Sequence, residues 1–387
     1  MLNKTSPGAP VWLGDTDCDL AAFRTHVERT TDPAFYPHAA EIVSNVPIYD
    51  GATLPVGSAP RAVMAEWNHA FSDGPGIIAI RGGYAELDLI DAVTEALSTI
   101  IMTEEASGAG AGDHFAAAGA NSRVWNAHEK LGVANPALFA RYNANPLIRW
   151  AAESWLGPAY QITTQVNVVR PGGPAQTAHR DYHMGFQTAE DLRRYPASQH
   201  ALSARLTLQG AVAHSDMPLA SGPTKLLPYS QSWLPGYLAV LRPEFRAYFE
   251  ETCIQIPLEK GDLLFFNPAT FHAAGQNDTR DVQRFANLMQ IGSAYGRSIE
   301  IVDRARLSRA VYPVLADLDL TPTQVETVVA ATAEGYPFPA NLDIDSPLSG
   351  MAPPSQQDLM RQALAEGWDA ARFDTELLAM EGRKRSH

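Results

Sequence analysis

Residues 176–183 read Gln-Thr-Ala-His-Arg-Asp-Tyr-His, and two potential metal ligands stand two positions apart in them. The stretch follows a run rich in β-branched residues, so we expect an extended chain there. Alternate side chains of an extended chain point to the same side, which places His179 and Asp181 on one face. An imidazole and a carboxylate are two of the three ligands in the facial triad that holds Fe(II). Taken alone, such a pair is explained better by a structural hydrogen bond than by metal binding. The choice between the two depends on the sequence downstream.

The third candidate ligand is His272, which lies 91 residues after Asp181 (272 − 181). That separation lets the chain cross a barrel and return beside the first two ligands. The apolar run Leu263 to Phe266 predicts a buried strand, and the segment Pro268 to Thr270 predicts a turn before the histidine. An isolated histidine is more often a hydrogen-bonded core residue, but its place after this strand and turn favours a metal ligand.

Arg284 is the candidate for binding a second anionic group. It stands twelve residues after His272 (284 − 272) and opens the predicted strand that runs to Ile291. A planar guanidinium matches a carboxylate with two parallel hydrogen bonds, so it suits the far end of a dicarboxylate. Arg280 is the rival, but it lies in the loop Asn-Asp-Thr-Arg-Asp, where we expect a solvated ion pair.

Four further polar residues are candidates for the same site. Gln165 and Asn167 share a parity on the strand that precedes the His-x-Asp stretch, and one of them could hydrogen-bond a cofactor. His183 could line a substrate pocket, and Gln176 could orient a metal ligand from behind. Exposed polar positions, or a hydrogen-bonded histidine at the rim, would explain the same residues. Trp125, Trp150 and Trp155 are predicted to be core residues.

Several of these segments together resemble the phytanoyl-CoA dioxygenase family of Fe(II)/2-oxoglutarate oxygenases, over roughly residues 76 to 292. Tyr229 and Gln231 stand where that family usually has glycine and histidine. The resemblance rests on the His179-Arg-Asp181 pair with its flanking Gln176 and His183, on the segment Ser221 to Gln231, on Lys260-Gly261-Asp262, and on the series His272, Gly275, Asn277 and Arg284.

The resemblance implies Fe(II), 2-oxoglutarate and O₂ as cofactors. It implies that His179, Asp181 and His272 hold the iron, and that Arg284 binds the far carboxylate of oxoglutarate. The implied reaction oxidises a C–H bond of a small organic molecule and releases succinate and CO₂. Hydroxylation is the expected outcome, with desaturation, cyclisation and epoxidation left open. Related halogenases carry a small residue in place of the acid, so Asp181 argues against halogenation.

Two other functions fit part of the pattern. A metal-dependent isomerase or hydrolase could use the same three ligands without oxoglutarate, but it would have no need of a buried guanidinium. A non-catalytic binding member would keep the fold and lose the ligands, whereas this sequence retains them.

The element pattern predicts an α+β protein whose core is an antiparallel barrel or jelly roll. The resemblance makes this core a double-stranded β-helix of the cupin type, with flanking helices and a helical carboxy-terminal extension. We expect an irregular arm with short helices over residues 1–75, the oxygenase core over 76–294 and the helical extension over 295–387, as one structural unit. Residues Ser107 to Gly112 are predicted to form a loop.

Charge and cysteine content narrow the class of partner and the compartment. The net charge of −14, from 29 basic and 43 acidic residues, argues against nucleic acid or an anionic membrane as partner. Only Cys18 and Cys253 occur, and the first ten residues carry no signal-type apolar core, so we expect a cytoplasmic protein. No apolar run is long enough for a membrane span. The terminal extensions could form a homodimer interface.

Overall fold

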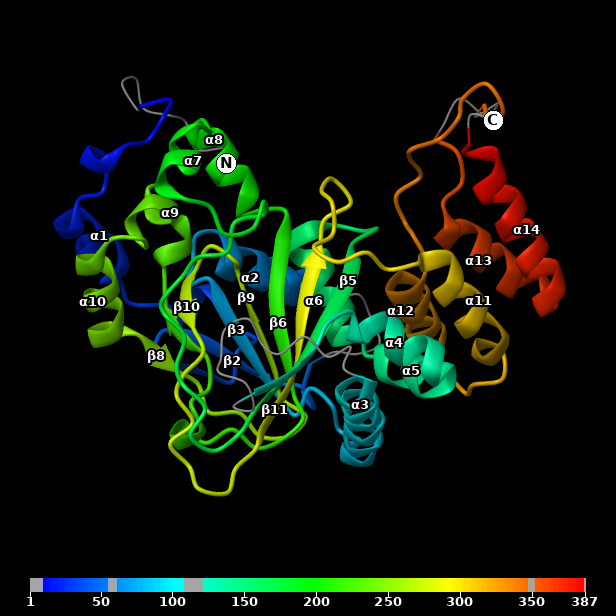
Figure 1. The fold of residues 1–387 in the computed structure, drawn as a ribbon, viewed down its shortest axis with the longest axis horizontal. Helices are drawn as coiled ribbons and strands as arrows, with labels where there is room; N and C mark the ends of the chain where they lie inside the picture. Colours follow the sequence, from blue (N-terminus) through cyan, green and yellow to red (C-terminus); the bar gives the residue numbers. More distant parts are fainter. Residues whose placement is uncertain (1–9, 55–60, 108–120, 347–351, 386–387) are drawn as a thin grey trace.

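The computed structural model describes residues 10–54, 61–107, 121–346 and 352–385. The described chain is a mixed α+β fold, in which a large, mostly antiparallel sheet and a small sheet are flanked by helices (Figure 1). The first nine residues and positions 108–112 of the predicted loop lie outside the described residues. None of the helices in the described ranges combines the length and the apolar composition that a bilayer crossing requires.

The large sheet has eight strands, and within the described residues only the β2–β3 pair is parallel. In spatial order the strands are β1 (Glu41–Val43), β2 (Val46–Asp50), β3 (Ile77–Arg81), β9 (Leu263–Phe266), β6 (Thr207–Ala213), β11 (Arg284–Gly292), β5 (Gln161–Val169) and β4 (Asn121–Val124). The small sheet contains β10 (Phe271–Ala273), β7 (Lys225–Leu227) and β8 (Ile254–Gln255).

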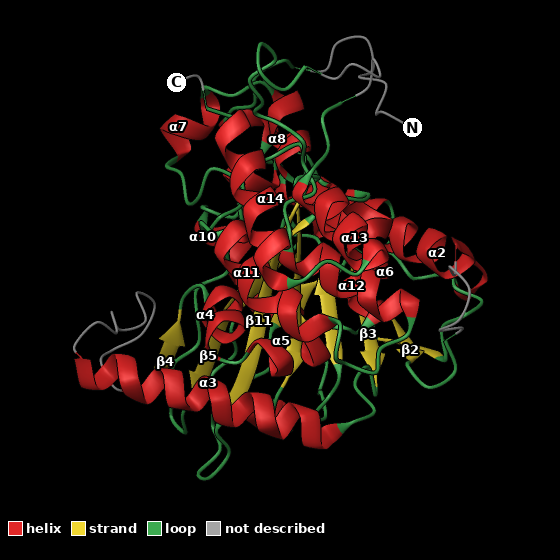
Figure 2. Ribbon diagram, turned by 90° about the vertical axis from the view of Figure 1, so that its right-hand side faces the viewer, coloured by secondary structure: helices red, strands yellow, loops and turns green. Residues whose placement is uncertain are grey.

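Helices cover one face of the large sheet and form the carboxy-terminal part of the chain (Figure 2). These helices are α2 (Arg61–Ser72), α3 (Leu87–Ser107), α4 (Ala127–Ala134), α5 (Pro136–Asn143), α6 (Pro146–Leu156), α11 (Arg304–Leu315), α12 (Pro322–Thr332), α13 (Gln356–Glu366) and α14 (Ala370–Arg383). The remaining helices are α1 (Leu20–Val27), α7 (Ala189–Arg193), α8 (Ala197–Ser203), α9 (Gly236–Ala239) and α10 (Pro243–Thr252).

Side-chain alternation along the central strands divides the large sheet into two buried faces. On β9, Leu263 and Phe265 join the core under the helices, whereas Leu264 and Phe266 join a second core that also contains Leu226 of the small sheet. Alternate residues of a strand point to opposite faces, so two of these side chains lie on each face of the sheet. All four are apolar and buried, which shows that both faces are covered. The second face, between the sheets, also carries the buried amides of Gln165, Asn167 and Gln209 from the neighbouring strands.

The strands predicted at Leu263 and Arg284 begin at those residues, as β9 and β11. In α3 the buried apolar residues recur at helical spacing, and Pro136 and Pro146 are the first residues of α5 and α6, a position that proline favours. The prediction of an irregular arm without strands is wrong for residues 41–50, which form β1 and β2. Their pairing with β3 depends on a contact across the sheet, and local sequence does not reveal such a contact.

The carboxy-terminal helices join the core under the large sheet. The Tyr312 and Phe373 rings stack with their centroids 4.0 Å apart, and the Tyr312 hydroxyl donates to the Trp368 carbonyl at 2.6 Å. The buried Arg304 guanidinium donates to the carbonyls of Ala331 (2.9 Å) and Ile162 (2.6 Å). This side chain links α11 and α12 to β5, so the predicted helical extension is tied directly to the sheet.

We expect Gly222→Ala to destabilise the protein more than Gly367→Ala does. Both glycines are in the left-handed region, at φ 70° and ψ 55° for Gly222 and φ 64° and ψ 44° for Gly367. A Cβ at Gly222 would lie 2.2 Å from the Gln276 carbonyl oxygen, whereas one at Gly367 meets nothing within 4 Å. Alanine at Gly367 should cost about 1–2 kcal/mol from the backbone alone. The clash at Gly222 should add about 1–3 kcal/mol.

Urea denaturation of the two variants and the parent protein measures both effects. Equal midpoints for the two variants would contradict the close approach of Gly222 to the backbone of Gln276.

Candidate active site

Two segments that are distant in sequence pair at the edge of the small sheet and bring the predicted ligands together. The His179 amide donates to the His272 carbonyl at 2.9 Å, and the His272 amide donates back to the His179 carbonyl at 3.0 Å. Further bonds on either side run from the Gln176 amide to the Ala274 carbonyl and from the Asp181 amide to the Pro268 carbonyl, both at 2.9 Å. The His-x-Asp stretch thus lies alongside β10 as an additional extended segment.

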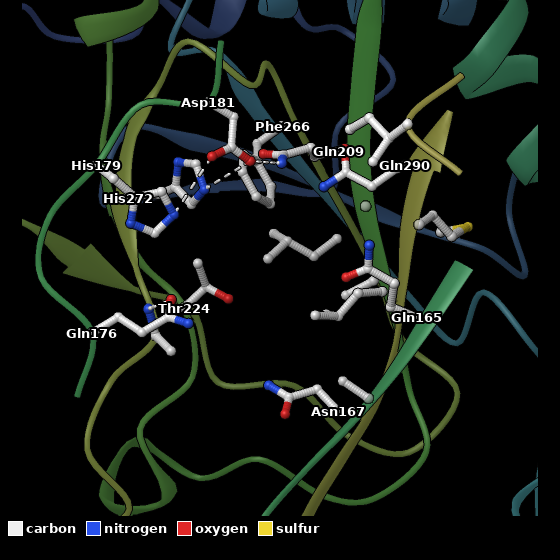
Figure 3. Close-up of a pocket in the computed structure, with 18 of the residues that line it drawn as sticks. Gln165, Asn167, Gln176, His179, Asp181, Gln209, Thr224, Phe266, His272 and Gln290 are labelled. Atoms are coloured by element: carbon white, nitrogen blue, oxygen red, sulfur yellow. Dashed lines mark hydrogen bonds and ion pairs between the residues drawn. The ribbon is translucent and has the colours of Figure 1, made fainter. Parts of the chain in front are cut away.

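The side chains of His179, Asp181 and His272 converge on one point (Figure 3). One possible ligand atom from each lies within 4.8 Å of the other two. The His179 Nε2 atom is 3.7 Å from Asp181 Oδ1, and the His272 Nε2 atom is 3.9 Å from Asp181 Oδ2. Distances of this size leave room for one cation between the three groups.

Backbone carbonyls orient both imidazoles. The Nδ1 atom of His179 donates to the Thr177 carbonyl at 2.9 Å, and that of His272 donates to the Thr270 carbonyl at 2.8 Å. Because a carbonyl can only accept, each Nδ1 carries the proton and each Nε2 lone pair faces the Asp181 side. Burial, the largest cause, lowers the pKa of His272 to about 4. At neutral pH, His272 is thus the neutral imidazole that metal binding requires.

Gln209 is a site residue that the sequence analysis missed. It lies on β6, and its Nε2 group donates a short hydrogen bond to Asp181 Oδ2. The available signal was a glutamine within the otherwise apolar and small run Leu208 to Ala213. The partner, however, lies on a separate segment 28 residues away, and no spacing rule indicates that contact.

Arg284 begins β11 and lines the same cavity as the three ligands. Its Nη1 group donates to the Ser221 carbonyl at 2.9 Å and to the Gly275 carbonyl at 3.4 Å, and no described carboxylate forms an ion pair with it. Burial lowers the pKa of Arg284 to about 10, so the guanidinium remains charged at neutral pH. Arg280 is exposed and does not line the cavity. The buried cation that faces the cavity is therefore Arg284.

The cavity has a volume of about 790 Å³ and lies between the two sheets. Gln165 and Asn167 line it from β5, on the wall opposite the histidines (Figure 3). The Gln165 Oε1 atom accepts from Arg123 Nη1 at 3.2 Å. The Asn167 Oδ1 atom is buried with no hydrogen-bond partner among the described residues. The strand parity that the sequence suggested thus places both amides on the cavity wall.

Gln176 and His183 also line the cavity. The Gln176 Oε1 atom accepts from the Ala274 amide at 3.3 Å, so this side chain holds the ligand-bearing segment to its neighbour. The His183 amide donates to Ser203 Oγ at 2.8 Å, and burial lowers the pKa of its ring below the usual value. An uncharged His183 ring thus borders the cavity.

Exposed apolar side chains surround the cavity on the side of residues 184–186 and 295–299. They are Met184, Phe186, Tyr295 and Ile299, with exposed fractions of 51% to 88%. The Phe186 ring meets the His179 ring edge to face, with centroids 5.5 Å apart. The prediction that Trp125 is a core residue is wrong: it is only half-buried and lines the cavity, whereas Trp150 is buried in the core.

These groups fit iron and a dicarboxylate by their chemistry. Two neutral imidazole nitrogens and one carboxylate oxygen form the donor set of facial-triad Fe(II) sites, which leave positions open for other ligands. A buried guanidinium without an acidic partner is a strong site for a carboxylate that enters the cavity. The residues that the sequence analysis assigned to metal and oxoglutarate therefore line one cavity, with donors suited to each.

Comparison with solved structures gives matches of low sequence identity. SnoN, a non-heme α-ketoglutarate-dependent epimerase from nogalamycin biosynthesis, is 18% identical, with a TM-score of 0.42 over 60% of this chain and 84% of that chain. SnoK, a non-heme α-ketoglutarate-dependent carbocyclase from the same biosynthesis, is 18% identical, with a TM-score of 0.44 over 63% of this chain and 89% of that one.

The sequence itself matches no curated protein. It does match the family model described as phytanoyl-CoA dioxygenase (PhyH) over residues 72–286, which is more than half of the 387 residues. The matched range includes all three converging ligands and Arg284. The chain therefore belongs to the phytanoyl-CoA dioxygenase family of Fe(II)- and 2-oxoglutarate-dependent enzymes.

Proposed function

We propose that this protein is a dioxygenase that hydroxylates an unactivated C–H bond of a small organic molecule, with oxoglutarate converted to succinate and CO₂. The observation that carries the proposal is the convergence of His179, Asp181 and His272 in a cavity that Arg284 also lines. Family membership supports the class of enzyme. Hydroxylation is the simplest outcome for a facial triad that retains its carboxylate.

Each residue has a defined role in this proposal. His179, Asp181 and His272 would hold Fe(II), which supplies the oxidising chemistry when oxoglutarate and O₂ are bound. Arg284 would receive the far carboxylate of oxoglutarate and so fix its orientation in the cavity. Gln165 and Asn167 would offer hydrogen bonds to oxoglutarate or substrate from the opposite wall. Gln176 would keep the ligand-bearing segment in place through its bond to Ala274.

The lining of the cavity supports a substrate with an apolar body. Leu264, Phe266 and Leu288 line its interior, and Met184 and Tyr295 extend the apolar surface outwards. His183 would contact the substrate as an uncharged group, because burial lowers its pKa. A cavity of about 790 Å³ is within the range of small-molecule sites, so we propose a small organic molecule rather than a polymer.

We further propose that the two sheets form a double-stranded β-helix, with residues 1–75 and 295–387 packed on the core of residues 76–294 as one unit. A shared apolar core supports the single unit, because it contains residues from all three ranges: Tyr49, Ile78, Val166, Leu307 and Phe373. The apolar layer between the sheets supports the jelly-roll arrangement.

The triad is tested by replacing its ligands. The wild-type protein with Fe(II) and oxoglutarate should release succinate, and Asp181→Asn and His272→Ala should abolish that release. His272→Ala removes one of three metal donors and Asp181→Asn replaces the anionic donor by a weaker, neutral amide oxygen, so Fe(II) affinity should fall roughly a hundredfold or more. Calorimetric titration with Fe(II) under anaerobic conditions measures the affinity. No oxoglutarate consumption by the wild-type protein across a broad substrate panel would favour a metal-dependent isomerase or hydrolase instead.

Arg284→Met should weaken oxoglutarate binding while the matched change Arg280→Met leaves it unaltered. Loss of a buried partner to a charged group costs about 2–5 kcal/mol, which corresponds to a Kd raised about thirtyfold or more. Arg284→Lys should give an intermediate loss, because a lysine keeps the charge but not the planar fork. Titration of the Fe(II)-loaded proteins with oxoglutarate gives the Kd values. Equal affinities for the Arg284 and Arg280 variants would exclude Arg284 as the anchor.

A further inference from the structure

Gln209 is a buried polar residue whose purpose the fold does not explain. It lies on β6 directly opposite Gln290 of β11, and only 4% of its surface is exposed. The next two inward positions on β6 are Ala211 and Ala213, which make this face of the strand small and apolar. Figure 3 shows the Gln209 amide directed at the Asp181 carboxylate.

The orientation of this amide is fixed by chemistry. An ionised carboxylate can only accept hydrogen bonds, so the group that faces Asp181 Oδ2 is the Gln209 NH₂ group. The Gln209 Oε1 atom consequently points away from the acid, and it is buried without a partner among the described residues. Among the described residues, Asp181 is therefore the hydrogen-bond partner that holds the side-chain amide.

The energetic balance argues against Gln209 as a filler of space. A buried carbonyl oxygen without a hydrogen-bond partner destabilises the fold, and a methionine would fill a similar volume without that cost. A hydrogen bond to a charged group stabilises more than one between neutral groups, so the bond to Asp181 can offset this loss. The contact with Asp181 is thus the interaction that justifies an amide at this position.

We infer that Gln209 is a positioning residue that fixes Asp181 as a one-oxygen ligand of the metal. The inference rests on the proposed function of the triad. Gln209 engages Oδ2, which lies 3.9 Å from the His272 Nε2 atom. Oδ1, 3.7 Å from the His179 Nε2 atom, is the oxygen left without a hydrogen bond among the described residues, so it would be the one that binds the cation. Gln209 itself does not bind metal, cofactor or substrate in this role.

The number of coordination positions makes this role important. A facial triad leaves three of six positions open. Oxoglutarate needs two of them for chelation, and O₂ needs the third. A carboxylate that binds the metal through both oxygens would occupy one of these positions. A hydrogen bond that keeps one oxygen off the metal therefore leaves room for both oxoglutarate and O₂.

The test compares Gln209→Met with the matched change Gln290→Met. Both replace a glutamine on facing strands by an uncharged side chain of similar length, but no hydrogen bond joins Gln290 to Asp181. The probe is Co(II), whose visible absorption depends on coordination number and geometry. Gln209→Met should weaken Co(II) binding by about 10- to 100-fold, the usual effect of losing an outer hydrogen-bond partner. It should also change the absorption bands, whereas Gln290→Met should leave affinity and bands as in the wild type.

Two further variants separate the possible failures. Gln209→Asn keeps the amide but is one methylene too short to reach Asp181, so it should reproduce the effects of Gln209→Met and serves if that variant does not fold. Asp181→Asn replaces the anionic ligand by a neutral amide oxygen and should weaken Co(II) binding more than either Gln209 variant. Loss in Asp181→Asn combined with wild-type binding and bands in both Gln209 variants would overturn the inference about Gln209 alone. Wild-type Co(II) binding in Asp181→Asn would overturn the triad itself.

Discussion

The mutual backbone bonds between His179 and His272 are the interaction on which the site depends. Each residue donates its amide to the carbonyl of the other, at 2.9 and 3.0 Å. Two candidate ligands 93 residues apart (272 − 179) therefore pair directly with each other, with their ring centroids 4.3 Å apart. Asp181 reaches the same point because it is two residues further along the extended segment. Backbone pairing thus brings residues that are distant in sequence together at the candidate metal site.

Two buried arginines near the His179–His272 pair, Arg180 and Arg284, donate to backbone carbonyls. Arg180 stands between the two ligands of the His-x-Asp stretch, with its side chain on the opposite side. Its guanidinium donates to the carbonyls of Trp233 (2.9 Å) and Gln231, and it lies over the Tyr237 ring, 4.3 Å from the centroid. These bonds hold the back of the ligand-bearing segment while its front faces the cavity. Arg284 uses carbonyls in the same way, but at the cavity wall, where a carboxylate can reach it.

Some motif residues prove to be structural. Asp262 of the Lys-Gly-Asp motif accepts from the amides of Gly82 (2.7 Å) and Glu259 (2.8 Å), so it holds the turn at the start of β9. Tyr229, which stands where the family usually has glycine, takes a φ of 67°, a conformation that glycine adopts more easily. The Tyr229 hydroxyl forms a 2.6 Å hydrogen bond with the Thr31 hydroxyl. A glycine could not make this contact with the amino-terminal segment.

The sequence by itself determined the candidate ligand types, the strand parity of Gln165 and Asn167, and the strands that begin at Leu263 and Arg284. These depend on local periodicity and residue chemistry, which a linear chain displays. Only the tertiary structure decided that Gln209 bonds to Asp181, that Trp125 lines the cavity and that residues 41–50 extend the sheet. Each of these facts is a contact between segments far apart in the chain, and such contacts are set by the packing of the whole fold.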